Sequence, residues 1–496
     1  MNNWMKALNL HYRYMKEQYP DKDLMLVFDI DGCINDMQYQ LFRALRTFDQ
    51  LQGTHYFYRL KPDEIKIHED LLSSFLTEYQ MLPELKKEFL SWYTRYRKSS
   101  RLQMRPMKGV IETIYWFQMQ SRTAVGLKNI CSQDMQQKTI QALKQFGKDY
   151  QLKLPDKLIY FPKHNSPSES AVESLSYFRN LGYHVICFVD SETQSLDAIA
   201  SEKDTRDILL LQADTVYRSN DQSVSATVEK GKHYELRELV HEKDLPAHID
   251  LVWHGINDRK NMQQFLSSPI QWGEVDVQSV HENGSVLLQH DSSLEDEMLL
   301  VEKIDLSLNE LLAEFQLHDK AVKIDFKDKG IVLRKTMQLL KKQGFTDQKI
   351  WLNGDIDVLK EEGFKLLLQA FPNATVQTAI DFICPLVFSL PDQAKQILMQ
   401  LKNWGINRFS ISWELEKCPT LLYQLKKWGF EVNVYNAPDL EQFLKVMILS
   451  PRSITSDFNF PEWNYYGRGS GKDGLQSDYV ERQVKLGSWK IKRGKT

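Results

Sequence analysis

The chain has 496 residues, of which 42% are hydrophobic and 26% charged, and its formal net charge is −3. This length exceeds what one hydrophobic core usually serves and predicts two domains, and the composition is that of an ordinary globular protein. The small net charge excludes a bulk attraction to nucleic acid or to anionic membranes. No apolar run suits a signal peptide or a bilayer span, and the five scattered cysteines form no CxxC pair, so we expect a cytoplasmic protein with reduced thiols.

The first part of the chain alternates short apolar runs with amphipathic stretches. Leu24–Phe28 is apolar throughout and ends in Asp-Ile-Asp-Gly, which is typical of a strand buried on both faces. From about residue 37 to residue 105 the apolar spacing is helical instead. Further strands are predicted at 123–127, 157–161, 184–190 and 208–214, with helices at 110–120, 135–147 and 170–183. This order predicts a doubly wound α/β domain over residues 1–220 that carries a helical cap.

A second alternation follows a polar, weakly periodic segment, residues 221–247, which we predict to be a linker. Most of the later strand candidates are separated by helices, several of which end in Gly, as helix C-caps do. The eight strand candidates are 249–254, 272–277, 321–326, 349–355, 375–381, 408–414, 431–436 and 452–458. Eight such units predict a (β/α)₈ (TIM) barrel over residues 248–460. A basic, Gly-rich tail, residues 461–496, completes the chain.

Polar residues gather at the carboxyl ends of these strand candidates, where barrel enzymes place their active sites. His254 ends the first strand, and His290, followed by Asp291, comes after a short extended run at 285–289. Two further pairs are spaced two apart and therefore project to one side of a strand: Glu274 with Asp276, and Asp325 with Lys327. Asp381 ends the fifth strand, and we take as candidate substrate-binding residues Asn353, Asp355, Glu414, Asn436 and Asp457.

The joint chemistry of these residues favours a phosphoester site. Carboxylates from adjacent strands make an oxygen-rich pocket suited to Mg²⁺ or Ca²⁺. Two histidines can serve as general base and general acid on either side of a phosphorus atom, and Lys327 can offset charge on the phosphate oxygens. Taken singly, each residue has a plainer explanation, because a strand-end His is usually structural and a strand-end Asp often caps the next helix.

The run GEVDVQSVHENGSVLLQHD resembles the second-strand signature of glycerophosphodiester phosphodiesterase-like barrels. The ordered set WHGIND, GEVDV, KIDFKD, WLNGDI and SDF, over about residues 249–459, is similar to segments of the menorin family, a branch of that superfamily. The resemblance implies a catalytic acid–base pair and three metal ligands. The pair is His254 and His290, and the ligands are Glu274, Asp276 and Asp325. At Asp325 the sequence departs from glycerophosphodiesterases, which usually carry Glu there.

The run Asp29-Ile30-Asp31-Gly32 resembles the first motif of the haloacid dehalogenase-like hydrolases. In that family the first Asp attacks phosphorus and the second protonates the leaving group. The resemblance implies Asp29 as nucleophile, Asp31 as acid–base, and both as ligands of Mg²⁺. Gly32 allows the sharp turn that follows the strand.

The later motifs of this family are less complete. The resemblance implies Asp190 as a further Mg²⁺ ligand, with Glu192 or Asp197 as its companion, and Lys163 as the lysine that neutralises the aspartyl-phosphate. Asn129 stands where the family has a phosphate-binding Ser or Thr, with Ser132 nearby, and the helical insert would shield the site as a cap. An ordinary polar loop is the plainer explanation of Asp190 and Glu192, and a solvated side chain that of Lys163.

Three functional hypotheses follow. In the leading one the barrel opens a small-molecule phosphodiester and the first domain removes the resulting phosphomonoester. In the second only one domain is catalytic and the other binds a ligand or regulates, which Asn129 favours. In the third the tail, with eight Lys or Arg and three acidic residues from Arg468 onward, serves nucleic-acid-linked phosphoester processing, although such tails are more often simply solvated. The identity of the phosphoester and the oligomeric state stay open.

Overall fold

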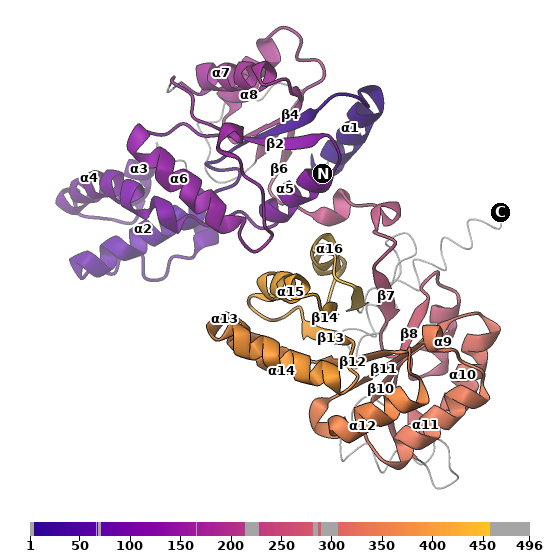
Figure 1. The fold of residues 1–496 in the computed structure, drawn as a ribbon. Coiled ribbons are helices and arrows are strands. Elements are labelled where there is room, and N and C mark those ends of the chain that lie inside the picture. The colour runs from indigo at the N-terminus through magenta and orange to yellow at the C-terminus, as the bar shows by residue number, and fades with distance from the viewer. Residues whose placement is uncertain are drawn as a thin grey trace. The chain divides into compact units, whose positions relative to one another are not determined.

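The computed structural model describes residues 4–65, 67, 71–164, 166–213, 228–280, 286–288 and 306–456. The chain divides into two compact units, Met1–Leu239 and Val240–Thr496 (Figure 1). Each unit has its own sheet, as the two alternations in the sequence predict. In this described part of the chain, none of the helices combines the length and the apolar composition that crossing a bilayer requires.

The first unit is built on a parallel sheet in the order β3-β2-β1-β4-β5-β6. All six residues of β1 are buried, which explains why its sequence is apolar without alternation. The neighbours β2 and β4 run parallel to β1, so the carboxyl ends of all three strands meet at one edge. The strands are β1 (Leu24–Asp29), β2 (Thr123–Lys128), β3 (Ile159–Tyr160), β4 (His184–Asp190), β5 (Leu209–Ala213) and β6 (Glu229–Gly231). The predicted doubly wound α/β fold is confirmed.

Helices flank this sheet, and one of them, α1, is not among the elements that the sequence predicts. In α1 (Trp4–Gln18) the buried residues recur every three or four positions, and the Trp4 indole N–H donates to the carbonyl oxygen of His233 at 2.8 Å. β6 and its surroundings fall inside the predicted linker, so the first unit extends through part of that segment. The other helices are α5 (Val110–Met119), α6 (Gln133–Phe146), α7 (Pro167–Asn180) and α8 (Thr193–Ser201), with short 3₁₀ turns at Asp156–Leu158 and Leu236–Glu238.

The predicted helical insert forms a layer with a core of its own. Its helices lie together beside α6 (Figure 1), and the buried side chains of the layer include Leu45, Phe48, Phe57 and Phe89. The helices are α2 (Met37–Gln52), α3 (Leu72–Glu78) and α4 (Pro83–Ser99), with 3₁₀ turns at Pro62–Glu64 and Ser100–Gln103. The last turn leads the chain back to the sheet, where it brings Arg101 into the interior.

Gly109 lets two parts of the first unit approach closely. It lies at φ +83°, and a Cβ there would stand 2.0 Å from the carbonyl oxygen of Tyr234. Gly53 has a similar φ of +63° but no atom within 4 Å of its Cβ position. We expect Gly53→Ala to lower the free energy of unfolding by about 1 to 2 kcal/mol, the cost of a left-handed side chain alone. Gly109→Ala should lower the free energy of unfolding by about 1 to 3 kcal/mol more than Gly53→Ala, because its Cβ also collides with the Tyr234 carbonyl oxygen. Urea titration of the two variants measures this difference. Equal losses in the two variants would contradict this.

The second unit is a closed barrel of eight parallel strands, as predicted, because β15 pairs with β7 and β10 pairs with β8. β9 (Val286–Leu288) lies antiparallel to β8 outside this circle. The barrel strands are β7 (Asp250–Trp253), β8 (Trp272–Val280), β10 (Ala321–Phe326), β11 (Ile350–Gly354), β12 (Thr375–Ala379), β13 (Arg408–Ser412), β14 (Glu431–Ala437) and β15 (Ser453–Ser456).

Helices surround the barrel strands (Figure 1). They are α9 (Arg259–Leu266), α10 (Leu308–Leu317), α11 (Ile331–Lys342), α12 (Ile356–Ala370), α13 (Cys384–Ser389), α14 (Pro391–Asn403), α15 (Cys418–Lys427) and α16 (Leu440–Ile448). Short 3₁₀ turns lie at Glu242–Asp244, Asp347–Lys349 and Asp381–Ile383.

A buried arginine closes the amino end of the barrel. Arg408, at the start of β13, lies 3.3 Å from Asp250 and 2.9 Å from Glu431, and its guanidinium stacks 4.4 Å from the Trp351 ring centre. Asp250 and Glu431 are themselves the first residues of β7 and β14. Ion pairs therefore tie the strand starts together, and the carboxyl end is left for a site.

Candidate functional sites

A cavity of about 260 Å³ lies at the carboxyl end of the barrel. Most of the barrel residues that the sequence singles out line it, namely His254, Glu274, Asp325, Lys327, Asn353, Asp355 and Asn436. Six further residues complete the lining: Lys323, Gln377, Ala379, Ser410, Tyr435 and Thr455. The barrel thus gathers in one cavity residues that are far apart in the sequence, from His254 to Thr455.

The side chains of β8, β10, β11 and β12 form one connected network. Lys327 Nζ lies 2.7 Å from Asp325 Oδ2 and 3.3 Å from Asp276 Oδ1. Asn353 donates its amide to Asp325 Oδ1 at 2.6 Å and accepts from the amide of Gln377 at 2.9 Å. Each carboxylate is therefore oriented by a neighbouring strand, because adjacent parallel strands place these positions in register.

Asn257 holds Asp276 from the loop after β7. Its amide donates to Asp276 Oδ2 at 2.7 Å, and its carbonyl oxygen accepts the backbone N–H of Asp276 at 3.0 Å. This double contact fixes the position of a carboxylate that has no exposed surface. Asn257 belongs to the WHGIND segment, but its role could not be derived from the sequence.

Glu274 is 3% exposed, and its two oxygens differ in environment. Oε1 lies 2.9 Å from Lys323 Nζ, which also donates to the hydroxyl of Thr455 at 3.1 Å. Oε2 is buried without a hydrogen-bond partner among the described residues. A buried carboxylate oxygen is unfavourable unless a donor or a cation faces it. Lys323 was missed from the sequence, although its spacing two residues before Asp325 marks it as facing the same side.

The charges in this cavity shift one another's titration. Burial alone would raise the pKa of Asp325, but Lys327, with Lys323 and the Asn353 amide, outweighs it and lowers the pKa. Burial would lower the pKa of Lys327, but Asp325 and Asp276 together raise it. At the rim, burial and the nearby Asp325 raise the pKa of Asp355. Asp325 and Lys327 are therefore ionised at neutral pH.

The barrel residues include oxygen donors of the kind that a divalent cation binds. Three carboxylates, Glu274, Asp276 and Asp325, face only two ammonium groups in the described part of the cavity, and Glu274 Oε2 lacks a donor. As they stand, however, no three His, Cys, Asp or Glu side chains among the described residues are arranged so that they could hold a metal ion. Lys327 lies between two of the carboxylates, but its side chain is 25% exposed and carries a flexible stem, so it can yield that place.

Several predicted barrel residues lie elsewhere. His290, Asp291 and Asp457 fall outside the described residues. Glu414 is exposed and does not line the cavity, because β13 ends at Ser412 and Glu414 follows in a turn. Its role as a substrate-binding residue stays a prediction that this position does not support. Asp381 accepts hydrogen bonds from the Tyr435 hydroxyl and from the Ser412 N–H, and so holds the cavity wall in place.

In the first unit the Asp29-Ile30-Asp31-Gly32 motif ends β1, as predicted, but a lysine contacts its first Asp. Lys128, the last residue of β2, lies 3.2 Å from Asp29 Oδ1 and 2.7 Å from Asp190 Oδ2. Asp29 and Lys128 are direct neighbours in the ladder between β1 and β2. Burial raises the pKa of Asp29 well above its ordinary value, against the pull of Lys128. Asp29, the predicted nucleophile, is only 7% exposed and forms an ion pair with the Lys128 ammonium group.

Asp31 is held by an arginine from the cap. Arg101, which is 1% exposed, donates to Asp31 Oδ1 at 2.7 Å, to Asn129 Oδ1 at 2.9 Å and to the Thr139 hydroxyl at 2.8 Å. Asn129 in turn donates to Asp31 Oδ2 at 3.1 Å. Burial alone would raise the pKa of Asp31, but Arg101, with Asn35 and Arg97, outweighs it and lowers the pKa. Both Asp31 oxygens therefore accept hydrogen bonds, and the group stays ionised.

The other first-domain predictions have mixed outcomes. Lys163 is exposed, and its backbone N–H bonds to Glu173 at 3.0 Å, so the lysine beside Asp29 is Lys128 and not Lys163. Asp190 does reach the motif, and its Oδ1 accepts the N–H of Glu192 at 2.9 Å. Asp197 lies on α8 and Ser132 precedes α6. Lys128 follows the apolar run TAVGL directly, a position that could have pointed to it.

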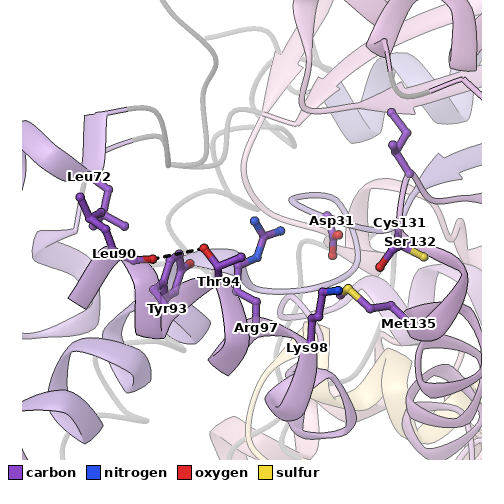
Figure 2. A pocket seen from close by; sticks show the side chains of 11 residues that line it. Asp31, Leu72, Leu90, Tyr93, Thr94, Arg97, Lys98, Cys131, Ser132 and Met135 are labelled. Carbon is purple, nitrogen blue, oxygen red and sulfur yellow. Dashed lines mark hydrogen bonds between the residues drawn. The ribbon is translucent and has the colours of Figure 1, made fainter. Parts of the chain in front are cut away.

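A cavity of about 470 Å³ lies between the cap and the sheet edge (Figure 2). Asp31 and Ser132 stand at one side, and Tyr93, Arg97 and Lys98 extend from α4 at the other. The remaining lining is Leu72, Leu90, Thr94, Ile130, Cys131 and Met135. Of the Asp29–Gly32 motif only Asp31 lines this cavity, so the predicted nucleophile does not border it.

The first-unit residues do not fit the Mg²⁺ that the resemblance implies. Lys128 already spans Asp29 and Asp190, and Arg101 neutralises Asp31. Neither Asp29 nor Asp190 is among the described side chains with a buried, partnerless oxygen. This differs from the barrel, where Glu274 offers such an oxygen.

The architecture is that of a Rossmann-like α/β unit and a TIM barrel in one chain. A family model for the menorin N-terminal domain matches residues 249–360, which run from β7 into α12. No curated protein matches the sequence.

Among solved structures, the chain is similar to proteins of two kinds, each over less than half of its length. An Oleispira antarctica phosphodiesterase in complex with sn-glycerol-3-phosphate is 13% identical, with 43% of this chain and 94% of that one covered and a TM-score of 0.33. An Agrobacterium tumefaciens glycerophosphodiester phosphodiesterase is 16% identical, with 42% of this chain and 95% of that one covered and a TM-score of 0.30. A HAD-family hydrolase from Deinococcus radiodurans, with bound phosphate and sodium, is 13% identical, with 42% of this chain and 91% of that one covered and a TM-score of 0.29.

Proposed function

We propose that the barrel is a metal-dependent phosphodiesterase for a small-molecule phosphodiester, and that the chain is therefore a phosphoric ester hydrolase. The observation that carries this proposal is the convergence of His254, Glu274, Asp325 and Lys327 on one cavity. An acid–base group, carboxylates and a cation at the carboxyl end of a barrel are the parts that phosphoester cleavage needs.

Each group has a role that follows from its surroundings. His254 moves a proton to or from the oxygen that attacks or leaves phosphorus, with His290 as its predicted partner. Glu274, Asp276 and Asp325 would hold a Mg²⁺ or Ca²⁺ ion, which offsets charge on the phosphate oxygens when bound. Lys327 contributes a second positive charge, and Asn353, Asp355 and Asn436 contact the substrate from the cavity wall.

The cation requirement is tested by removing the metal. We expect dialysis of the full chain against EDTA to lower hydrolysis of bis(p-nitrophenyl) phosphate by at least about 100-fold, and Mg²⁺ or Ca²⁺ to restore it. Asp325→Asn should lower activity similarly at saturating metal, because it removes a ligand. Asp328→Asn is the matched control, since the Asp328 side chain caps only the N–H of Lys329 at the surface. Full activity of Asp325→Asn in EDTA would contradict the proposal.

The bifunctional hypothesis stays a prediction, and the first unit supports it less well than the barrel supports cleavage. A nucleophilic carboxylate has to reach phosphorus, yet Asp29 is buried against Lys128 and does not line the cap cavity. A general acid has to carry a proton, yet Arg101 keeps Asp31 ionised. The nucleic-acid hypothesis rests on the tail, which lies outside the described residues, and also stays a prediction.

A further inference from the structure

The first unit contains a buried lysine that the proposed function does not use. Lys128 is 1% exposed, and its Nζ lies 2.7 Å from Asp190 and 3.2 Å from Asp29. These are two of the carboxylates to which the haloacid dehalogenase resemblance assigns Mg²⁺. The ammonium group therefore stands between the oxygens that a metal ion would bind.

The surroundings of Lys128 keep it in that place. Its backbone belongs to β2, which is paired along its whole length with the central strand β1. Its ammonium lies over the ring of Phe188, 6.0 Å from the ring centre, and both side chains have almost no exposed surface. Moving the ammonium away would leave two buried carboxylates without their cation, and breaking such a buried pair costs several kcal/mol.

The remaining oxygens of the site also have partners. Asp190 Oδ1 accepts the backbone N–H of Glu192, and both oxygens of Asp31 accept hydrogen bonds from Arg101, Asn129 and Asn35. A divalent ion needs several oxygens turned toward one point, whereas these are turned toward protein donors. Lys327 of the barrel is different, because its side chain is 25% exposed and Glu274 Oε2, in the same cavity, lacks a donor among the described residues.

We propose that Lys128 is the built-in cation of the first unit, and that Asp29 and Asp190 therefore take up no divalent metal. The site is then held together by the protein's own charges. This inference stands apart from the barrel proposal, because it concerns residues of the first unit only.

The number of Mn²⁺ ions bound per full-length chain tests the inference. We expect one ion for the wild type, in the barrel, and none for Asp325→Asn, which leaves the first unit untouched. Lys128→Ala should bind one ion more than the wild type, because it frees Asp29 and Asp190 and leaves room for a metal. Its thermal midpoint should be lower than that of the wild type in EDTA and should rise when Mn²⁺ is added, since the ion binds the folded state. Equilibrium dialysis and electron paramagnetic resonance of free Mn²⁺ give the counts.

The outcomes separate the two proposals. A bound ion in Asp325→Asn that disappears in Asp325→Asn/Asp190→Asn would overturn the inference, and so would a folded Lys128→Ala chain that binds no additional ion. No ion in the wild type would defeat the barrel proposal but would agree with this inference. If Lys128→Ala does not fold, the Asp325→Asn chain decides: no ion supports the inference, an ion that persists after Asp190→Asn belongs to the barrel and also supports it, and an ion that Asp190→Asn removes overturns it.

Discussion

Replacing His254 with Gln is expected to lower kcat for bis(p-nitrophenyl) phosphate by about 10²- to 10⁴-fold, the usual contribution of a general acid or base. His254 follows the last residue of β7 and lines the same cavity as Glu274 and Asp325. A glutamine retains hydrogen-bonding capacity there but does not exchange a proton near neutral pH. The loss should therefore fall on kcat more than on KM.

Two comparisons sharpen this test. His248→Gln is the matched control, because His248 lies before β7 and bonds the Ser450 hydroxyl at the surface, at the opposite end of the strand. An alkyl phosphodiester, with its poorer leaving group, distinguishes the role of His254. If His254 is the general acid, the loss is larger for the alkyl diester, and if it is the base, the two losses are equal. Undiminished cleavage of both substrates by His254→Gln would remove His254 from the mechanism.

Replacing Arg101 with Met is expected to lower the free energy of unfolding of the first unit by about 3 to 5 kcal/mol. Arg101 connects the end of the cap to Asp31 at β1, to Asn129 after β2 and to Thr139 on α6. Methionine keeps much of the buried volume but leaves the Asp31 carboxylate without its cation and the Asn129 carbonyl oxygen without its donor. Leaving such groups unpaired accounts for most of the loss.

Urea titration measures this effect, and Arg43→Met is its control. Arg43 donates to Gln103 near Arg101 but at the surface, so its loss should stay within about 0.5 kcal/mol. The pKa of Asp31 is lowered in the folded chain, so its ion pair stabilises the fold above the ordinary pKa and loses this effect as the pH falls through the lowered one. The difference between the Arg101 and Arg43 variants should accordingly shrink in acid. An equal loss in both variants at neutral pH would contradict the role of Arg101.

The sequence alone was sufficient for the architecture of both units and for most of the barrel site. Apolar runs and helical periodicity are local signals, and they placed all eight barrel strands and five of the six strands of the first sheet. The barrel residues could be predicted because parallel strands bring their carboxyl ends to one place, so polar residues at those ends have to converge. Glu414 is an exception: it lies in the turn after β13 and does not line the cavity, although His254, Lys327 and Asp355, just beyond their own strands, do.

What the tertiary structure decided is which charged groups meet. Asp29, Lys128 and Asp190 come from three strands, and their contact depends on strand order and register, which the sequence does not display. Arg101 approaches from the cap, so its partners follow from how the helical layer packs on the sheet. Likewise, the places of α1 and β6 in the fold depend on contacts with residues distant in sequence, such as that of Trp4 with His233 and that of β6 with β5. The spacing of apolar residues in a segment predicts which of its faces is buried. A buried charge, however, is stable only beside its partner, and the packing of the fold determines which residues distant in sequence become partners.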